Sequence, residues 1–268
     1  PYILIPSVIA IVLIAGYFGW PYIKNIIYPP KLVLSEPLND KIITAEEFTN
    51  LKKDGLILSW EGLPSVDSYH LYVYQLGKDT DGKDVRESIF GKDENSFMPV
   101  STTEKNKDNS KENKENKDKT ITYTIPKEKL FKGFTYSWYV IPIDSKGEEV
   151  KKYKSDEWKF TTPPLEKPEL IEPAPNQKDV SLTPTFKWKY KDEDSIDEFR
   201  LYIREEGEGK PLLVRKEFKA KELKKDPSTQ EFSYTLSSDE KLSYNITYIW
   251  NIEALKYSIN GRFQTNIK

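Results

Sequence analysis

The sequence contains no cysteine and only one histidine, His70, among its 268 residues. Without thiols the chain has no disulfide and no cysteine-ligated metal site. One imidazole is too few for the common arrangements of nucleophile, base and orienting group. The sequence therefore favours a non-enzymatic protein, and we expect no catalytic residue, no metal and no cofactor.

The sequence also lacks an excess of charge of either sign. Its 41 basic and 43 acidic residues give a formal net charge of −2. Proteins that bind nucleic acid neutralise phosphates with clustered Lys and Arg, so no nucleic-acid partner is expected. The acidic residues show no calcium-loop spacing. The glycines at 207 and 209 lack the strand and helix that flank a phosphate-binding loop.

Residues 2–23 carry no charge at all. A helix of that length spans about 33 Å, which is enough to cross the apolar core of a bilayer. We therefore predict a single transmembrane helix within residues 1–28 that contacts lipid, with the rest of the chain outside the cytoplasm. The expected anchor side chains include Ile9, Ile11, Leu13, Trp20 and Tyr22. A filament core of the type IV pilin kind is the main alternative, although pilins carry Glu where this chain has Ile5.

Residues 101–119 contain no apolar side chain. Such a segment cannot bury enough surface to offset the entropy lost on ordering. We interpret it as a disordered, charged insertion that forms a solvated loop.

A short pattern occurs twice in the remainder: Leu, five residues, Tyr, one residue and Trp. It is found at Leu130, Tyr136 and Trp138, and again at Leu242, Tyr248 and Trp250. Apolar and polar residues alternate around both copies, which indicates strands, and the recurrence indicates two copies of one β module. A proline-rich joint at 163–168 separates them. We predict a first module over 29–163 and a second over 164–268.

Further strands are expected from the same alternation. In the first module they lie at 56–60, 69–74, 120–125 and 158–160, and in the second at 184–188, 199–203, 232–236 and 263–265. The segment 263–265 is matched with 160–162 as the closing strand of its module. Thr44 and Glu47 fit a capping box, so a short helix is expected to follow them.

These residues resemble the fibronectin type III family of seven-stranded β-sandwiches. The family has a core Trp on its second strand, matched by Trp60 and Trp188, and an apolar third strand, matched at 69–73 and 199–203. It also has a Leu-x-x-Gly-x-x-Tyr corner, matched at 130–136 and, with Asn at the turn, at 242–248. The resemblance implies an all-β fold of two tandem antiparallel sandwiches, in which each corner Tyr hydroxyl bonds to backbone upstream. Residues 168–188 are similar to the bacterial branch of the family. The fold itself hosts many functions.

The outward faces of the two modules differ. By strand alternation, the first module presents Tyr72, Tyr74, Tyr139 and Ile141, beside His70. The second presents Arg200, Tyr202, Arg204, Ile249, Asn251 and Glu253. A contiguous aromatic patch indicates a packing partner. The four residues of the first module are therefore predicted to bind a protein partner, with the alternative that the long insertion of that module covers its own sheet.

Together these features predict a membrane-anchored structural or scaffold protein of an envelope or surface assembly. In that assembly it would act through protein–protein contacts. Two alternatives remain open at this point. One is a surface-filament subunit with residues 2–23 as its core. The other is an adhesin or receptor-like module that binds a glycan or a peptide.

Overall fold

The computed structural model describes residues 31–101 and 120–267. The predicted transmembrane segment 2–23, with Ile9, Ile11, Leu13, Trp20 and Tyr22, lies outside these ranges, as does nearly all of the charged insertion. Within the described residues, no helix combines the length and the apolar character needed to cross a bilayer.

The first module is a pair of β-sheets. One sheet has the order β1-β3-β7 and is antiparallel. The other has the order β2-β9-β8-β4-β5, with β6 also beside β4 and β2 parallel to β9. The strands are β1 (Leu34–Glu36), β2 (Lys41–Ile42), β3 (Leu56–Glu61), β4 (Ser68–Lys78), β5 (Asp84–Ser88), β6 (Met98–Ser101), β7 (Thr120–Ile125), β8 (Thr135–Pro142) and β9 (Trp158–Thr161).

The second module repeats this plan with fewer strands. Its sheets have the orders β10-β11-β14 and β13-β12-β15-β16, and all pairs are antiparallel. The strands are β10 (Glu169–Glu172), β11 (Thr185–Lys189), β12 (Glu198–Glu205), β13 (Leu212–Lys219), β14 (Phe232–Thr235), β15 (Tyr248–Tyr257) and β16 (Gln264–Ile267). A three-stranded sheet facing a four-stranded one is the architecture of a seven-stranded sandwich, as the sequence predicts.

Within residues 31–101 and 120–267, helical structure is limited to α2 (Ala45–Asp54) and single turns. The predicted capping box is confirmed: the Glu47 N–H donates to the Thr44 hydroxyl at 3.2 Å, and the Thr44 N–H donates to the Glu47 carboxylate at 2.8 Å. Phe48 on α2 is buried in the core of the first module. The 3₁₀ turns are η1 (Lys127–Lys129), η2 (Lys151–Tyr153), η3 (Glu193–Ser195) and η4 (Ser238–Glu240).

The repeated tryptophans occupy the space between the sheets. Trp60, Trp138 and Trp188 are fully buried, while Trp250 is half-buried and meets Phe186 edge to face. Burying large rings is the main favourable contribution to such a core. The predicted core positions of the repeat are thus confirmed.

Both tyrosine corners are also confirmed. In the first, the Tyr136 hydroxyl accepts a hydrogen bond from the Phe131 N–H at 2.8 Å. In the second, the Tyr248 hydroxyl accepts one from the Ser243 N–H at 2.9 Å. The turn before each Tyr has a residue with positive φ, Gly133 at 81° and Asn245 at 59°. Glycine and asparagine adopt that conformation at the lowest cost.

The predicted match between 263–265 and 160–162 holds for the strands, because β16 lies beside β15 as β9 lies beside β8, but it is wrong for the two phenylalanines. Phe160 lies on β9 opposite Tyr136, inside its own module. Phe263 instead lies in the tight turn between β15 and β16 and joins the core of the first module. The connection before β9 is long, whereas the turn after β15 closes within Ser258–Phe263, where the Ser258 N–H donates to the Phe263 carbonyl. Sequence similarity alone does not reveal that difference in loop length.

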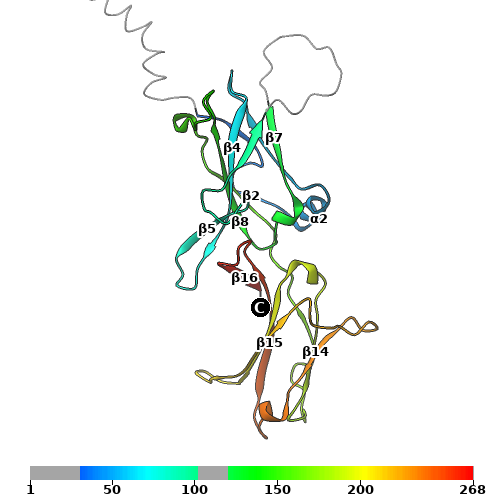
Figure 1. Ribbon diagram of the computed structural model, residues 1–268. Coiled ribbons are helices and arrows are strands. Elements are labelled where there is room, and N and C mark those ends of the chain that lie inside the picture. The colour runs from blue at the N-terminus through cyan, green and yellow to red at the C-terminus, as the bar shows by residue number, and fades with distance from the viewer. Residues whose placement is uncertain (1–30, 102–119, 268) are drawn as a thin grey trace, which may run out of the picture.

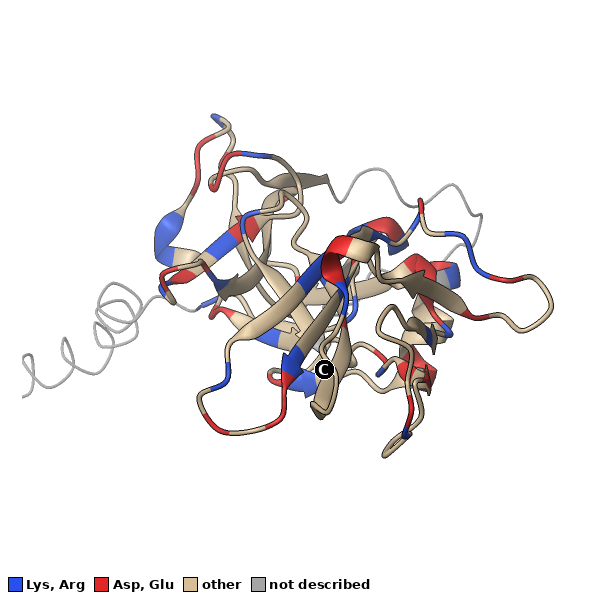
Figure 2. Cartoon of the chain, turned by 90° about the horizontal axis from the view of Figure 1, so that it is seen from below, with Lys and Arg blue, Asp and Glu red and all other residues tan. Residues whose placement is uncertain are grey.

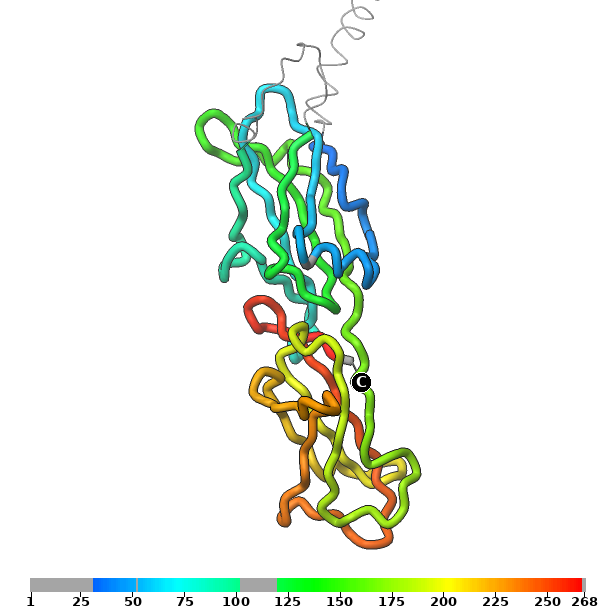
Figure 3. Tube along the Cα trace, turned by 90° about the vertical axis from the view of Figure 1, so that its right-hand side faces the viewer, coloured from blue at the N-terminus to red at the C-terminus, as the bar shows by residue number. Residues whose placement is uncertain are grey.

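The two sandwiches are arranged end to end, as two views at right angles show (Figures 1 and 3). The β15–β16 turn, red in Figure 3, lies at the junction between them. Seen from the second-module end, basic and acidic segments are mixed around the loops (Figure 2). The molecule is therefore elongated. Because charges of both signs are mixed at the second-module end, that end has no electrostatic field of a single sign.

Candidate functional site

The four residues predicted to bind a partner do lie together on the outer face of β4 and β8. Tyr72 is paired with Tyr139 across the strands, and their rings stack with centroids 4.8 Å apart. Tyr74 and Ile141 complete the cluster. However, the four side chains are only 1–8% exposed. The expectation of an open aromatic patch is wrong, because other parts of the first module cover it.

The cover comes from β5, the β5–β6 connection and the loop after β8. The Phe97 ring stacks on the His70 ring at 3.6 Å. The Arg86 guanidinium lies 4.4 Å from the centre of the Tyr74 ring, and the Lys154 ammonium lies 3.5 Å from that of Tyr139. Cations over aromatic faces are favourable contacts. The first module thus closes this face with its own residues, which is the alternative that the sequence left open.

A small polar cluster fixes one edge of the cover. The Glu149 carboxylate accepts a hydrogen bond from the Tyr72 hydroxyl at 2.5 Å and contacts His70 Nδ1 at 2.9 Å. Burial alone would raise the pKa of Glu149, but these two hydrogen bonds lower it. Burial raises the pKa of Tyr72 and of Tyr74 well above the ordinary tyrosine value. The His70 side chain is only 18% exposed, so it is partly covered rather than a freely exposed strand residue.

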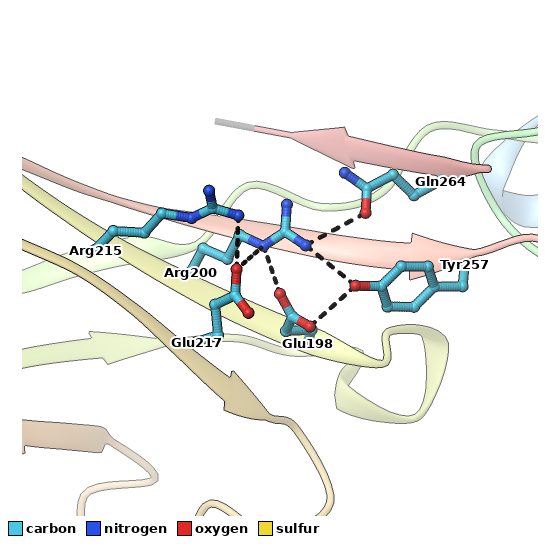
Figure 4. Close-up of polar contacts among 6 residues, drawn as sticks. All are labelled: Glu198, Arg200, Arg215, Glu217, Tyr257 and Gln264. Carbon is cyan, nitrogen blue, oxygen red and sulfur yellow. Dashed lines mark hydrogen bonds and ion pairs between the residues drawn. The ribbon is translucent and has the colours of Figure 1, made fainter. Parts of the chain in front are cut away.

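The corresponding face of the second module carries charges at its joint end (Figure 4). Arg200 Nε donates to Glu198 at 2.5 Å and lies 3.3 Å from Glu217. Arg200 Nη2 donates to the Tyr257 hydroxyl at 3.1 Å, and that hydroxyl donates to Glu198 at 3.0 Å. Each charge in this network has a partner of the opposite sign, so the network stabilises the sheet and offers no free group.

The same face is hollow farther from the joint. A cavity of about 410 Å³, open to solvent, lies over β12, β13 and β15. Leu212 is 47% exposed and Ile249 40% exposed at its walls. The lining residues are Tyr202, Arg204, Leu212, Ile249, Asn251 and Glu253. Five of these six belong to the outward set expected from the sequence.

The joint between the modules is a third feature, and sequence reasoning missed it. The Ile259 N–H of the second module donates to the Gln75 side-chain carbonyl at 2.7 Å. The N–H groups of Asn260 and Arg262 donate to the Glu87 carboxylate at 2.8 and 3.0 Å. Gln75 and Glu87 are almost completely buried. A buried carboxylate that accepts two backbone N–H groups is stable only while those donors stay in place.

Apolar contacts complete the joint. Phe263 is 5% exposed and meets Phe134 edge to face with ring centroids 5.8 Å apart. A Cβ at Gly77 would lie 2.1 Å from the Phe263 ring, so only glycine leaves room for it. The ammonium of Lys132 pairs with Asp192 across the joint at 2.7 Å.

The sequence does hold a signal for this joint. Gln75 and Gly77 continue the inward alternation of β4, where apolar residues are expected. A glycine inside a strand often marks the close approach of another chain segment.

A metal centre is not visible in these faces. Across residues 31–101 and 120–267, no group of three or more His, Asp or Glu side chains is arranged to hold a metal ion.

Comparison with known proteins gives structural likenesses only. No protein family and no curated protein matches the sequence. The chain is similar to a tetra-tandem repeat in the extending region of a large adhesion protein, with 12% identity and a TM-score of 0.33 over 88% of this chain and 47% of that one. It is also similar to the FN1–FN3 domains of chicken CNTN1, with 13% identity and a TM-score of 0.23 over 89% of this chain and 65% of that one.

A marsupial T cell receptor gives 12% identity and a TM-score of 0.30 over 88% of this chain and 70% of that one. The chain thus spans about half of the adhesion-protein structure and about two thirds of the CNTN1 one. With TM-scores this low, the comparisons carry no argument about function. The strand order of the chain itself supports a fibronectin-type-III-like or immunoglobulin-like sandwich.

Proposed function

We propose that this protein is a non-enzymatic, membrane-anchored structural subunit of an envelope or surface assembly. In this proposal residues 2–23 hold it in the lipid bilayer, and both sandwiches lie outside the cytoplasm. The sandwiches act as a stiff rod that presents a protein-binding surface at a fixed distance from the membrane.

The observation that carries the proposal is the joint. Domains connected by a linker alone move freely relative to one another, and that is the default expectation for a tandem pair. Here the Ser258–Phe263 turn places Phe263 in the core of the first module and gives the buried Glu87 carboxylate two backbone N–H donors. Bending the rod would expose that ring and leave that carboxylate without donors. A stiff joint suits a spacer or scaffold.

The length of the rod supports the same role. A strand such as β15, with its ten residues, spans about 33 Å at the usual rise per residue. Two such sandwiches end to end place the far end of the second module about 70 Å from the start of the first. That distance exceeds the thickness of a bilayer, so the far end can meet partners well away from the membrane.

Fractionation of native cells tests the proposal. Cells are sheared, then extracted with detergent, and each fraction is cross-linked and immunoblotted. We expect the protein in the detergent fraction, cross-linked to a different polypeptide, and a matched variant without residues 2–23 in the soluble fraction. Recovery from the sheared material as a ladder of homopolymers would overturn the proposal in favour of a filament subunit.

A further inference from the structure

The outer faces of the two modules are built on corresponding pairs of strands, but one face is covered by its own chain and the other is not. In the first module, β4 and β8 pair Tyr72 with Tyr139. In the second, β12 and β15 pair Tyr202 with Asn251. When the two modules are aligned, Tyr202 corresponds to Tyr72, and Arg204 corresponds to Tyr74. The first face is covered by its own chain, and the second is open over the hollow.

The difference arises from the connections. In the first module the loop after β8 supplies Glu149 and Lys154 to the cover. In the second module the equivalent connection is the short turn Ser258–Phe263, which is committed to the joint. Leu212, the first residue of β13, reaches only the wall of the hollow. No described segment of the chain therefore closes the second face.

The hollow combines apolar walls with one free cation. Leu212 and Ile249 form exposed walls, and Tyr202 lies between them and the Arg200 network. Arg204 is exposed, and within residues 31–101 and 120–267 it makes no ion pair and no cation–π contact. An arginine can accept a ring on its planar face while its edge binds a carboxylate. The missing complement is thus an aromatic ring with a carboxylate nearby.

The cover of the first module uses an aromatic and an acidic side chain of one extended segment together. Its extended segment carries Glu94 and, three residues later, Phe97. The Glu94 carboxylate accepts a hydrogen bond from Arg86 Nε at 2.8 Å. The Phe97 ring stacks on His70 and lies 5.7 Å from the Tyr72 ring. The aromatic ring of this segment thus packs on the face itself, and its carboxylate binds Arg86, the arginine of β5 that lies over Tyr74.

We propose that the hollow of the second module binds an extended segment of another protein that carries an aromatic side chain next to acidic residues. The ring lies between Leu212 and Ile249 against the Arg204 guanidinium, and a carboxylate of the segment pairs with the edge of the same guanidinium. This inference deepens the proposed scaffold function and rests on it, since it names the chemistry of the partner and places the contact on the outer half of the rod.

The test uses the full chain and a fluorescent peptide with the sequence of residues 92–101, KDENSFMPVS. We expect saturable binding at micromolar peptide, weakened by salt because an ion pair contributes. Arg204→Glu and Ile249→Ser are each expected to weaken binding by about tenfold or more, which corresponds to about 1.4 kcal/mol. Lys221→Glu, an equal change of charge in the exposed turn after β13, is the control and is expected to have no effect.

Two peptide variants separate the two parts of the contact. Replacing the Phe by Ala removes the ring, and replacing the Asp and Glu by Asn and Gln removes the charge, and each is expected to weaken binding. No binding at 1 mM peptide, or binding that Arg204→Glu leaves unchanged, would overturn the proposal. So would a chain that dimerises through this face, or one that binds glycans through Ile249 instead of the peptide.

The scaffold function is judged separately. The Arg204→Glu protein is expected to fractionate with the membrane and to keep a stiff joint, because Arg204 lies far from both. If Arg204→Glu loses peptide binding but fractionates normally, the hollow is confirmed as the peptide site and the scaffold function is unaffected. If the unaltered chain is not recovered in the detergent fraction, the scaffold function fails, whatever the result of the peptide-binding measurement.

Discussion

Replacing Gly77 by Ala is expected to unlock the joint from the side of the first module. The added Cβ would lie 2.1 Å from Phe263 Cδ2 and 2.4 Å from Cε2, whereas carbon atoms in contact are about 3.5–4.0 Å apart. The backbone of Gly77 does not have a positive φ, so alanine itself fits and the effect is purely steric. Either the ring shifts, at about 1–3 kcal/mol, or it leaves the core, at about 3–5 kcal/mol.

A double-mutant cycle with Phe263→Ala isolates this contact. Phe263→Ala alone is expected to weaken docking of the modules by about 3–5 kcal/mol. In that background Gly77→Ala should cost less than about 0.5 kcal/mol, because the ring it would strike is gone. The coupling energy between the two sites is then about 1–3 kcal/mol if the ring shifts, in the range found for residues in contact, and about 3–5 kcal/mol if the ring leaves the core.

The assay is the distribution of distances between two spin labels, one in each module. The chain has no cysteine, so Glu128→Cys and Ser233→Cys, both at exposed positions, create the only labelling sites. A narrow distribution is expected for the parent and a broad one for Gly77→Ala. A second pair within the first module, Glu128→Cys with the exposed Ile57→Cys, should stay narrow throughout.

Docking energies come from urea unfolding of the same variants. Coupled modules are expected to unfold in one transition, and uncoupled modules in two. Strictly additive effects of the two substitutions, or a Gly77→Ala distribution as narrow as that of the parent, would show that the Phe263 ring does not hold the modules together.

Three further predictions concern single side chains. The hydrogen bond from Lys216, with those from Tyr234 and Ser237, holds the pKa of Glu240 at about 2, below its ordinary 4.5. The ionised Glu240 therefore stabilises the folded state fully above about pH 4.5, and this stabilisation is lost as the pH falls toward 2. The free energy of unfolding of Glu240→Gln should depend less on pH in that interval. Tyr136→Phe should lower the free energy of unfolding by about 1–3 kcal/mol and Tyr248→Phe by less, since the first hydroxyl is fully buried and also accepts from Gln75. Tyr74→Ser, at a side chain 1% exposed, should cost about 3–5 kcal/mol in urea unfolding; a cost below 1 kcal/mol would mean that the cover opens readily.

Local patterns in the sequence predicted the framework of the fold. Trp60 and Trp188 follow strand alternation, and each corner Tyr is six residues after its Leu. Such relations depend on neighbours in the chain, which alternation and turn chemistry describe directly. They also placed the outward side chains on the correct sheet faces.

Contacts between distant segments were beyond those patterns. The cover over Tyr72 depends on Glu149, which is 77 positions away, and on Phe97 from an insertion. The hollow exists because the equivalent loop of the second module is short. Alternation states which way a side chain points, but it does not state what lies on top of it.

The joint has a consequence for how the protein is made. Gln75 meets Ile259 across 184 positions of sequence, and Phe263 belongs to the core of a module synthesised long before it. At about 5–20 residues per second, a ribosome needs roughly 10–40 s to cover that interval. During this time the site that Phe263 fills in the first module is unoccupied, and the Glu87 carboxylate lacks the backbone N–H donors of Asn260 and Arg262. A factor that covers this unfilled site during synthesis would protect the nascent protein until residues 258–263 dock.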